Sequence, residues 1–185
     1  PMPAIYFATT NAGKIKEAGE ILGIEIIGTP LEINEIQSLD PEKVALAKAA
    51  AYYEKLKGPV LVEDVSLTFH ALVSLPGPYI NDFAKALGNA GLTALLEDKG
   101  DRSATAQTTL VFYDSKGKSH VFTGQMKGSI SAKVAGNQGF GWDPIFIPEG
   151  FEKTLGETSR EEKNKISMRR IALEKFKAFL QNNPI

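Results

Sequence analysis

The chain has 185 residues and a formal net charge of −1 at pH 7, with 43% hydrophobic and 23% charged residues. This balance is ordinary for a globular protein, and we predict a single domain over residues 1–185. The near-neutral charge argues against a nucleic-acid partner, and the absence of cysteine excludes disulfides and thiolate metal sites. No apolar run approaches a membrane span and no signal peptide opens the sequence, so we expect a cytoplasmic protein with no membrane partner.

Strand and helix patterns alternate through the first half of the chain. The Asp40–Pro41 pair predicts the start of an alanine-rich helix, because aspartate caps helices and proline suits their first turn. In chain order, we predict a strand over residues 4–9, a helix over 13–22, a strand over 25–28, a helix from Pro41 to about Gly58, a strand over 59–69 and two short helices within 79–98, joined near the sequence GNAG.

The second half of the chain contains a predicted hairpin. Residues 103–113 and 119–134 alternate in polarity, are rich in Thr, Val and Phe, and flank the turn sequence DSKGK. The last third ends in a helix that reaches Leu180. Early strand–helix units followed by an antiparallel hairpin predict an α/β fold with a mixed sheet and flanking helices.

The stretch FATTNAGKIKEA, residues 7–18, joins the first predicted strand to the first predicted helix. Helix starts usually favour negative side chains, yet this one carries Lys14 and Lys16. Backbone N–H groups near Gly13 and the lysine charges suit an external phosphate. The alternative is an ordinary glycine turn with solvated lysines.

Three acidic residues form the second candidate feature. Glu63 and Asp64 are expected at a strand end, after the apolar residues VLV, and Glu35 lies in a loop before a helix. Adjacent strand residues point to opposite faces, so Glu63 and Asp64 should have different roles. Carboxylates without cysteine or histidine partners favour a hard cation such as Mg²⁺. The alternative is that all three are solvated surface acids.

The stretch GNQGFGWDPIFIPEG places glycines around Phe140 and Trp142. Asp143 precedes a proline and is therefore expected to be extended. Aromatic rings in such a loop can present a face to a planar ligand such as a base. The alternative is a turn whose aromatics belong to the core.

The stretch TSREEKNKISMRR predicts two successive helices. Ser159 and Glu162 fit a capping box, and Ser167 is placed to cap a second helix. Three cations, Lys163, Arg169 and Arg170, are expected to gather at this junction, although an amphipathic helix with solvated cations is the alternative.

Together these features suit a nucleoside triphosphate, and the chain resembles the inosine/xanthosine triphosphate pyrophosphatase family. The resemblance is carried in order by TTNAGKIKE, NEIQ, VLVEDVSLTFHAL, LPGPYINDF, GFGWDPIF and EEKNKISMRR. It implies an elongated mixed sheet with two lobes around a central active-site cleft, and a homodimer. It also implies Mg²⁺-dependent hydrolysis, with Mn²⁺ as a possible substitute, of ITP, dITP and XTP to the monophosphate and pyrophosphate.

The same resemblance implies roles for individual residues. Asp64 is expected to bind metal and to accept the proton of the attacking water, and Glu35 is expected to bind metal. The expected substrate-binding residues are Thr9, Thr10, Asn11, Ala12, Gly13, Lys14, Lys48, Val65, Phe140, Gly141, Trp142, Asp143, Lys163, Met168 and Arg169.

Two positions depart from the family pattern. Met168 stands where the family usually has histidine, and Asn81 stands where lysine is common. A thioether is at best a weak hydrogen-bond acceptor, so the choice of base is left open. A pyrophosphatase with a shifted base preference and a non-catalytic nucleotide-binding protein are the alternatives. The presence of Lys14, Glu35 and Asp64 favours an enzyme.

Overall fold

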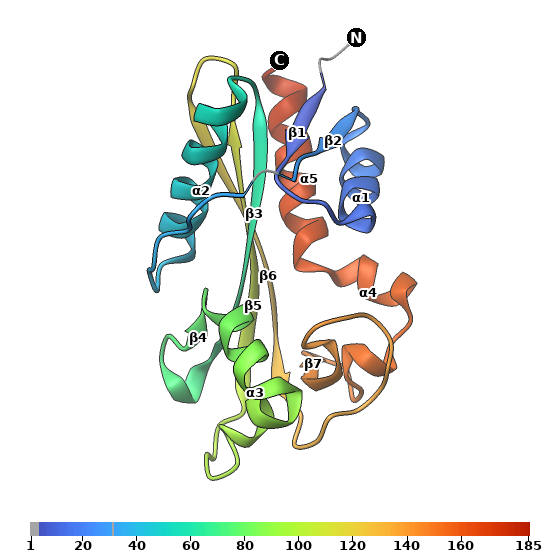
Figure 1. The fold of residues 1–185 in the computed structure, drawn as a ribbon. Helices are drawn as coiled ribbons and strands as arrows, with labels where there is room; N and C mark the ends of the chain where they lie inside the picture. Colours follow the sequence, from blue (N-terminus) through green and yellow to red (C-terminus); the bar gives the residue numbers. More distant parts are fainter. Residues whose placement is uncertain (1–3, 31) are drawn as a thin grey trace. The chain divides into compact units, whose positions relative to one another are not determined.

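A computed structural model describes residues 4–30 and 32–185 of the chain (Figure 1). The chain divides into two compact units. The first unit comprises Pro1–Asp64, Thr108–Gly124 and Arg169–Ile185, and the second comprises Val65–Gln107 and Gln125–Met168. Three long strands belong in part to each unit: β3 (Val60–Phe69), β5 (Ser103–Tyr113) and β6 (Ser119–Ile130).

The strands described by the structure form one mixed sheet of seven, which confirms the predicted α/β class. Its order is β2-β1-β3-β5-β6-β7, and β4 pairs with β3 off this path. The β1 strand (Ile5–Phe7) is parallel to both β2 (Ile26–Gly28) and β3, with Tyr6 opposite Val60. The pairs of β3 with β4 (Pro76–Gly77) and of β6 with β7 (Phe146–Pro148) are antiparallel.

The helices of the first unit begin and end close to where the sequence predicts. Helix α1 runs over Ala12–Leu22 and helix α2 over Pro41–Leu56, after the Asp40 cap that the sequence predicts. Helix α5 (Met168–Asn182) follows a break at Ser167, two residues after the break that the sequence predicts near Lys165. None of the helices in the described residues has the length and apolar composition needed to cross a membrane.

The two faces of β3 in the first unit are covered by different helices. Leu61 packs in a cluster with residues of α1 and α5, whereas Val60 and Val62 pack in a cluster with residues of α2. Side chains alternate along a strand, so Glu63 continues the Leu61 face and Asp64 continues the Val62 face. The strand period therefore directs the two acids toward different helices.

The second unit contains helix α3 (Ile80–Ala94) and helix α4 (Arg160–Ile166). Helix α3 is interrupted at Gly88, where φ is +67° and ψ is 176°, which confirms the predicted pair of short helices. Ser159 caps α4 by accepting a hydrogen bond from the N–H of Glu162 at 3.2 Å.

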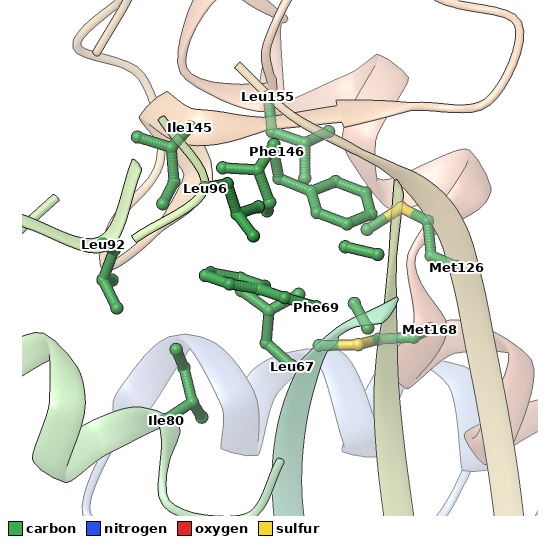
Figure 2. Packing of buried hydrophobic residues seen from close by; sticks show 13 residues of the cluster. Leu67, Phe69, Ile80, Leu92, Leu96, Met126, Ile145, Phe146, Leu155 and Met168 are labelled. Atoms are coloured by element: carbon green, nitrogen blue, oxygen red, sulfur yellow. The ribbon is translucent and has the colours of Figure 1, made fainter. Parts of the chain in front are cut away.

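The core of the second unit is a cluster of apolar side chains drawn from β3, α3, β6 and β7 (Figure 2). Phe69 and Phe146 are fully buried members of it. Met168 is a further member and is 8% exposed, so its flexible thioether fills space among large apolar side chains. This packing gives Met168 a role in the core.

The predicted hairpin is formed by β5 and β6, and Asp114 organises its turn. The Asp114 N–H donates to the carbonyl of Lys118 at 2.9 Å, and its Oδ1 accepts from the N–H groups of Lys116 and Lys118. The β6 strand ends at Ile130, four residues before the predicted boundary, where the chain passes into bends and turns.

Candidate functional site

The turn before α1 is held by its own side chains. Thr9 Oγ1 accepts from the N–H of Asn11 at 3.1 Å, and Asn11 Oδ1 accepts from the N–H of Lys14 at 3.1 Å. Asn11 is thereby the helix cap, and no acidic residue occupies the first helical turn. Thr10, Asn11, Ala12 and Gly13 are exposed, so the positive end of the helix dipole is open to an anion.

Glu63 lies beneath this turn as a buried carboxylate with two cationic partners. Lys14 Nζ lies 3.0 Å from Glu63 Oε1. Arg169 donates from Nε to Oε2 at 2.5 Å and from Nη2 to Oε1 at 3.2 Å, a two-point contact. Burial alone would raise the pKa of Glu63, but Arg169 and Lys14 outweigh it and hold that pKa below its ordinary value.

Arg169 also contacts a second acid, which the sequence analysis did not include. Glu17 Oε1 lies 3.7 Å from Arg169 Nη1. Glu17 follows Lys14 by three positions on α1, and residues at that spacing share a helix face. This spacing is the signal by which Glu17 is detectable from sequence.

Asp64 lies on the opposite face of β3 and has a different environment. The residue is 9% exposed, and its Oδ2 has no hydrogen-bond partner among the described residues. Burial raises the pKa of Asp64 to about 7. The nearby Lys48 lowers this pKa, but the negative charges of Glu35 and Glu63 raise it further. The prediction that the two neighbouring acids have different roles agrees with these environments.

Lys48 connects the residues on the Asp64 face. Its Nζ lies 3.1 Å from Glu35 Oε1 and donates to the backbone carbonyl of Glu63 at 3.3 Å. The prediction that Lys48 and Glu35 belong to one site with Asp64 is consistent with this pairing and with the electrostatic effect of both on Asp64. Glu35 is half exposed, so one side of this group faces solvent.

The residues present fit a partial site for a hard cation. No group of three or more His, Asp or Glu side chains placed to enclose a metal occurs in residues 4–30 and 32–185. Mg²⁺ commonly uses one or two carboxylates and completes its shell with water and phosphate oxygens. The unpartnered Oδ2 of Asp64, with Glu35 as a second carboxylate, matches that pattern.

Asp143, which is 4% exposed, organises the glycine-rich loop that contains Phe140 and Trp142. Its Oδ2 accepts from the N–H of Phe140 at 3.0 Å and from Lys163 Nζ at 2.6 Å. Lys163 Nζ also lies 4.5 Å from the centre of the Phe140 ring, a cation–π contact. Phe140 is 49% exposed.

Other residues of this loop serve its packing. Trp142 meets Phe146 edge-on with ring centres 5.4 Å apart, at the margin of the core cluster. Asn89 Nδ2 donates to the carbonyl of Gly141 at 2.9 Å and ties the loop to α3, a contact without a sequence signal. Val65 packs against the same cluster. Contacts of Trp142, Val65 and Met168 with substrate remain predictions.

The three cations predicted to gather at the α4–α5 junction have different acidic partners. Lys163 pairs with Asp143, Arg169 pairs with Glu63, and Arg170 lies 3.6 Å from Glu174 on its own helix. The partners of Lys163 and Arg169 are distant in sequence and neutralise largely buried charges, whereas Arg170 and Glu174 form a local, half-exposed pair. The gathering of the three cations remains a prediction.

The raised pKa of Asp64 predicts a pH-dependent difference in stability between the wild type and Asp64→Asn. The folded protein keeps the Asp64 proton up to about pH 7, whereas the unfolded chain releases it near the ordinary value of 3.8. The stabilising effect of this proton is therefore complete below about pH 4 and is lost as the pH rises through 7. Asp64→Asn should be the more stable protein at pH 8, by at most roughly 4 kcal/mol.

Urea unfolding of both proteins between pH 4 and 8, with a chelator present, measures this difference. Titrating groups that do not interact with Asp64 contribute equally to both proteins and cancel. A stability difference that does not change with pH would contradict the raised pKa of Asp64.

The fold and these residues define a class: a mixed α/β protein whose site combines buried carboxylates with lysine and arginine. Residues 5–179 match the model of the Ham1 family, and the chain belongs to this family. The resemblance inferred from the sequence motifs is thereby confirmed.

Relatives with assigned names cover nearly the whole chain. A protein of Methanopyrus kandleri named dITP/XTP pyrophosphatase is 41% identical over 97% of this chain and 97% of its own length. A protein of Kluyveromyces lactis named inosine triphosphate pyrophosphatase is 39% identical over the full length of both chains.

Solved structures show the same fold. The Staphylococcus aureus Ham1 protein superposes with a TM-score of 0.87 and is 30% identical, over 97% of this chain and 99% of that one. A HAM1 protein from Coxiella burnetii superposes with a TM-score of 0.89 and is 29% identical, over 98% of this chain and all of that one.

Proposed function

We propose that this protein hydrolyses the non-standard purine nucleoside triphosphates ITP, dITP and XTP to the monophosphate and pyrophosphate. The observation that carries the proposal is Asp64, a buried carboxylate whose Oδ2 has no hydrogen-bond partner among the described residues and can therefore accept a proton or bind a cation. The named activities of relatives about 40% identical over nearly the full chain support the same reaction.

The residues of the first unit have distinct tasks in this proposal. The open N-terminus of α1 and Lys14 bind phosphate oxygens, and Asp64 accepts the proton of the attacking water at its carboxylate. Asp64 and Glu35 would hold the Mg²⁺ or Mn²⁺ ion. When bound, this ion supplies positive charge against the phosphates and lowers the pKa of water.

The base is assigned to Phe140 and Lys163 of the second unit. Phe140 offers an exposed ring for stacking. Lysine is a donor only, so it favours an oxo group over an exocyclic amine. This chemistry selects hypoxanthine and xanthine over adenine.

A shifted base preference is the second candidate function. Met168 lies in the apolar core of the second unit rather than offering a polar atom, which is the specific observation in its favour. A homodimer and a cytoplasmic location complete the proposal, and sedimentation of the purified protein tests the first of these.

Pyrophosphate release tests the reaction itself. The triphosphates of inosine, xanthosine, guanosine, adenosine and the pyrimidines should each be assayed with Mg²⁺ and with a chelator. Mg²⁺-dependent release that is fastest with inosine and xanthosine triphosphates supports the proposal. Faster release from another base identifies the shifted enzyme, and binding without release identifies a non-catalytic protein.

Lys14→Ala should weaken triphosphate binding far more than nucleoside binding, because the ammonium contacts phosphate. A hydrogen bond to a charged group contributes about 1.5–3 kcal/mol, which is roughly a 10- to 150-fold increase in KM. The loss should shrink as salt rises, because mobile ions screen the attraction.

Lys16→Ala is the matched control for this measurement. Lys16 is on the same helix but is 79% exposed in its side chain and pairs only loosely, at 3.9 Å, with Glu20. Its removal should leave KM unchanged. Equal losses of triphosphate and nucleoside affinity in Lys14→Ala would indicate a folding defect instead.

A further inference from the structure

We propose that Glu63 is a positioning residue: its buried carboxylate holds Lys14 and Arg169 in the places from which they act on the triphosphate. This inference rests on the proposed function and extends it to a residue that does not itself contact substrate.

The contacts of Glu63 show how one carboxylate serves two cations. Oε1 lies 3.0 Å from Lys14 Nζ and accepts a hydrogen bond from Arg169 Nη2 at 3.2 Å. Oε2 accepts a hydrogen bond from Arg169 Nε at 2.5 Å. The Glu63 side chain is 4% exposed, so water does not compete for these oxygens. The planar two-point contact fixes the guanidinium in orientation as well as in distance.

The position of Glu63 on β3 explains why it can link these partners. Lys14 is on α1 and Arg169 is on α5, and residues of both helices pack with Leu61 on the same strand face. The strand β3 therefore carries the carboxylate of Glu63, while the helices α1 and α5 carry the cations Lys14 and Arg169. Site residues held by packed elements keep their geometry better than residues held by loops.

The pairing within the cluster leaves donors of Lys14 for an anion. A buried carboxylate is costly unless it is paired, and Lys14 and Arg169 supply the pairing. A lysine ammonium has three N–H donors, so one contact with Glu63 leaves others for phosphate oxygens. Glu63 can therefore hold Lys14 before and during substrate binding.

The backbone carbonyl of Glu63 also contacts the group of residues around Asp64, on the other face of β3. This carbonyl accepts from Lys48 Nζ at 3.3 Å, and Lys48 pairs with Glu35. One residue thus contacts cations on both faces of β3. A purely stabilising ion pair would have no need of partners that are themselves assigned to the site.

A double-mutant cycle on binding of inorganic tripolyphosphate tests the inference. Calorimetry would compare wild type, Lys14→Ala, Glu63→Gln and the double variant. In the wild-type background Lys14→Ala should weaken binding about tenfold, and in the Glu63→Gln background the same change should cost less than about threefold. A merely structural Glu63 gives equal losses in both backgrounds, and that result would overturn the proposal.

Two further variants keep the test decisive. Glu174→Gln removes the acid that pairs with Arg170 on the exposed side of α5, and it should leave the Lys14→Ala loss at its wild-type size. Glu63→Asp keeps the charge but shortens the side chain by one methylene. In the Glu63→Asp background, Lys14→Ala should also weaken tripolyphosphate binding less than it does in the wild type. Glu63→Asp takes the place of Glu63→Gln in the cycle if Glu63→Gln does not fold. A wild-type loss in Glu63→Asp would overturn positioning, since charge alone would then suffice.

The cycle is independent of hydrolysis. If the wild type releases no pyrophosphate from any nucleotide, the proposed function fails while the tripolyphosphate cycle still decides the role of Glu63. If the enzyme is active, Glu63→Gln should in addition lower kcat about 10- to 100-fold at temperatures well below its unfolding. Unchanged kcat, or no tripolyphosphate binding by the wild type, would overturn the inference.

Discussion

Asp64→Asn is expected to lower turnover of inosine triphosphate by roughly 10²- to 10⁴-fold, the usual loss when a general base is removed. Asparagine has nearly the same shape but cannot take a proton from water at neutral pH. It also supplies a neutral oxygen in place of a charged metal ligand, so loss of Mg²⁺ would add to the effect. Nucleotide binding should remain measurable, because Lys14 and the N-terminus of α1 are unchanged.

The measurement is kcat at saturating nucleotide over a range of Mg²⁺ concentrations. Asp98→Asn is the matched control, because Asp98 is an exposed aspartate in the other unit and should leave kcat unchanged. Near-normal turnover of Asp64→Asn at saturating Mg²⁺ would remove Asp64 from the catalytic assignment. Higher stability of the same variant at pH 8, with lower activity, would be the expected trade-off between stability and function.

Gly136→Ala should destabilise the protein by roughly 3 kcal/mol or more. Gly136 has a φ of +89°, which L-residues with side chains rarely adopt. A Cβ built there would lie 2.1 Å from the carbonyl carbon and oxygen of Gly156 and 2.5 Å from the backbone nitrogen of Glu157. Backbone atoms cannot rotate away, so the loop leading to Phe140 would have to move.

Gly150→Ala separates the two causes of this loss. Gly150 has a similar φ of +85°, but a Cβ there meets no atom within 4 Å. It should cost only the strain of the left-handed conformation, about 1–2 kcal/mol. Urea unfolding of both variants gives the comparison, and equal losses would mean that the close approach to Gly156 has no energetic effect.

The sequence alone predicted much of the local structure. Asp40 with Pro41, and Ser159 with Glu162, mark helix starts because their caps use atoms within three residues. The hairpin turn at DSKGK is equally local, since Asp114 bonds to Lys116 and Lys118, both within four residues of it. The sequence was also enough to identify the family, because the family's motifs occur in order along most of the chain.

The sequence also predicted that Glu63 and Asp64 would differ, because strand residues alternate between faces. It did not predict the partner of either acid. Arg169 is 106 positions from Glu63, and only the packing of α5 against β3 brings the two together. Lys163 and Arg169, which are close in the sequence, likewise pair with acids on different elements, Asp143 and Glu63.

Tertiary structure therefore decided the electrostatics of the candidate site. A pKa depends on burial and on charges within a few ångströms, and neither is encoded in local spacing. The packing that buries Asp64 without a hydrogen-bond partner raises its pKa, while the packing that surrounds Glu63 with two cations lowers its pKa. The sequence predicted which residues carry the chemistry, and long-range packing determined which of them are buried and which acids and cations are paired.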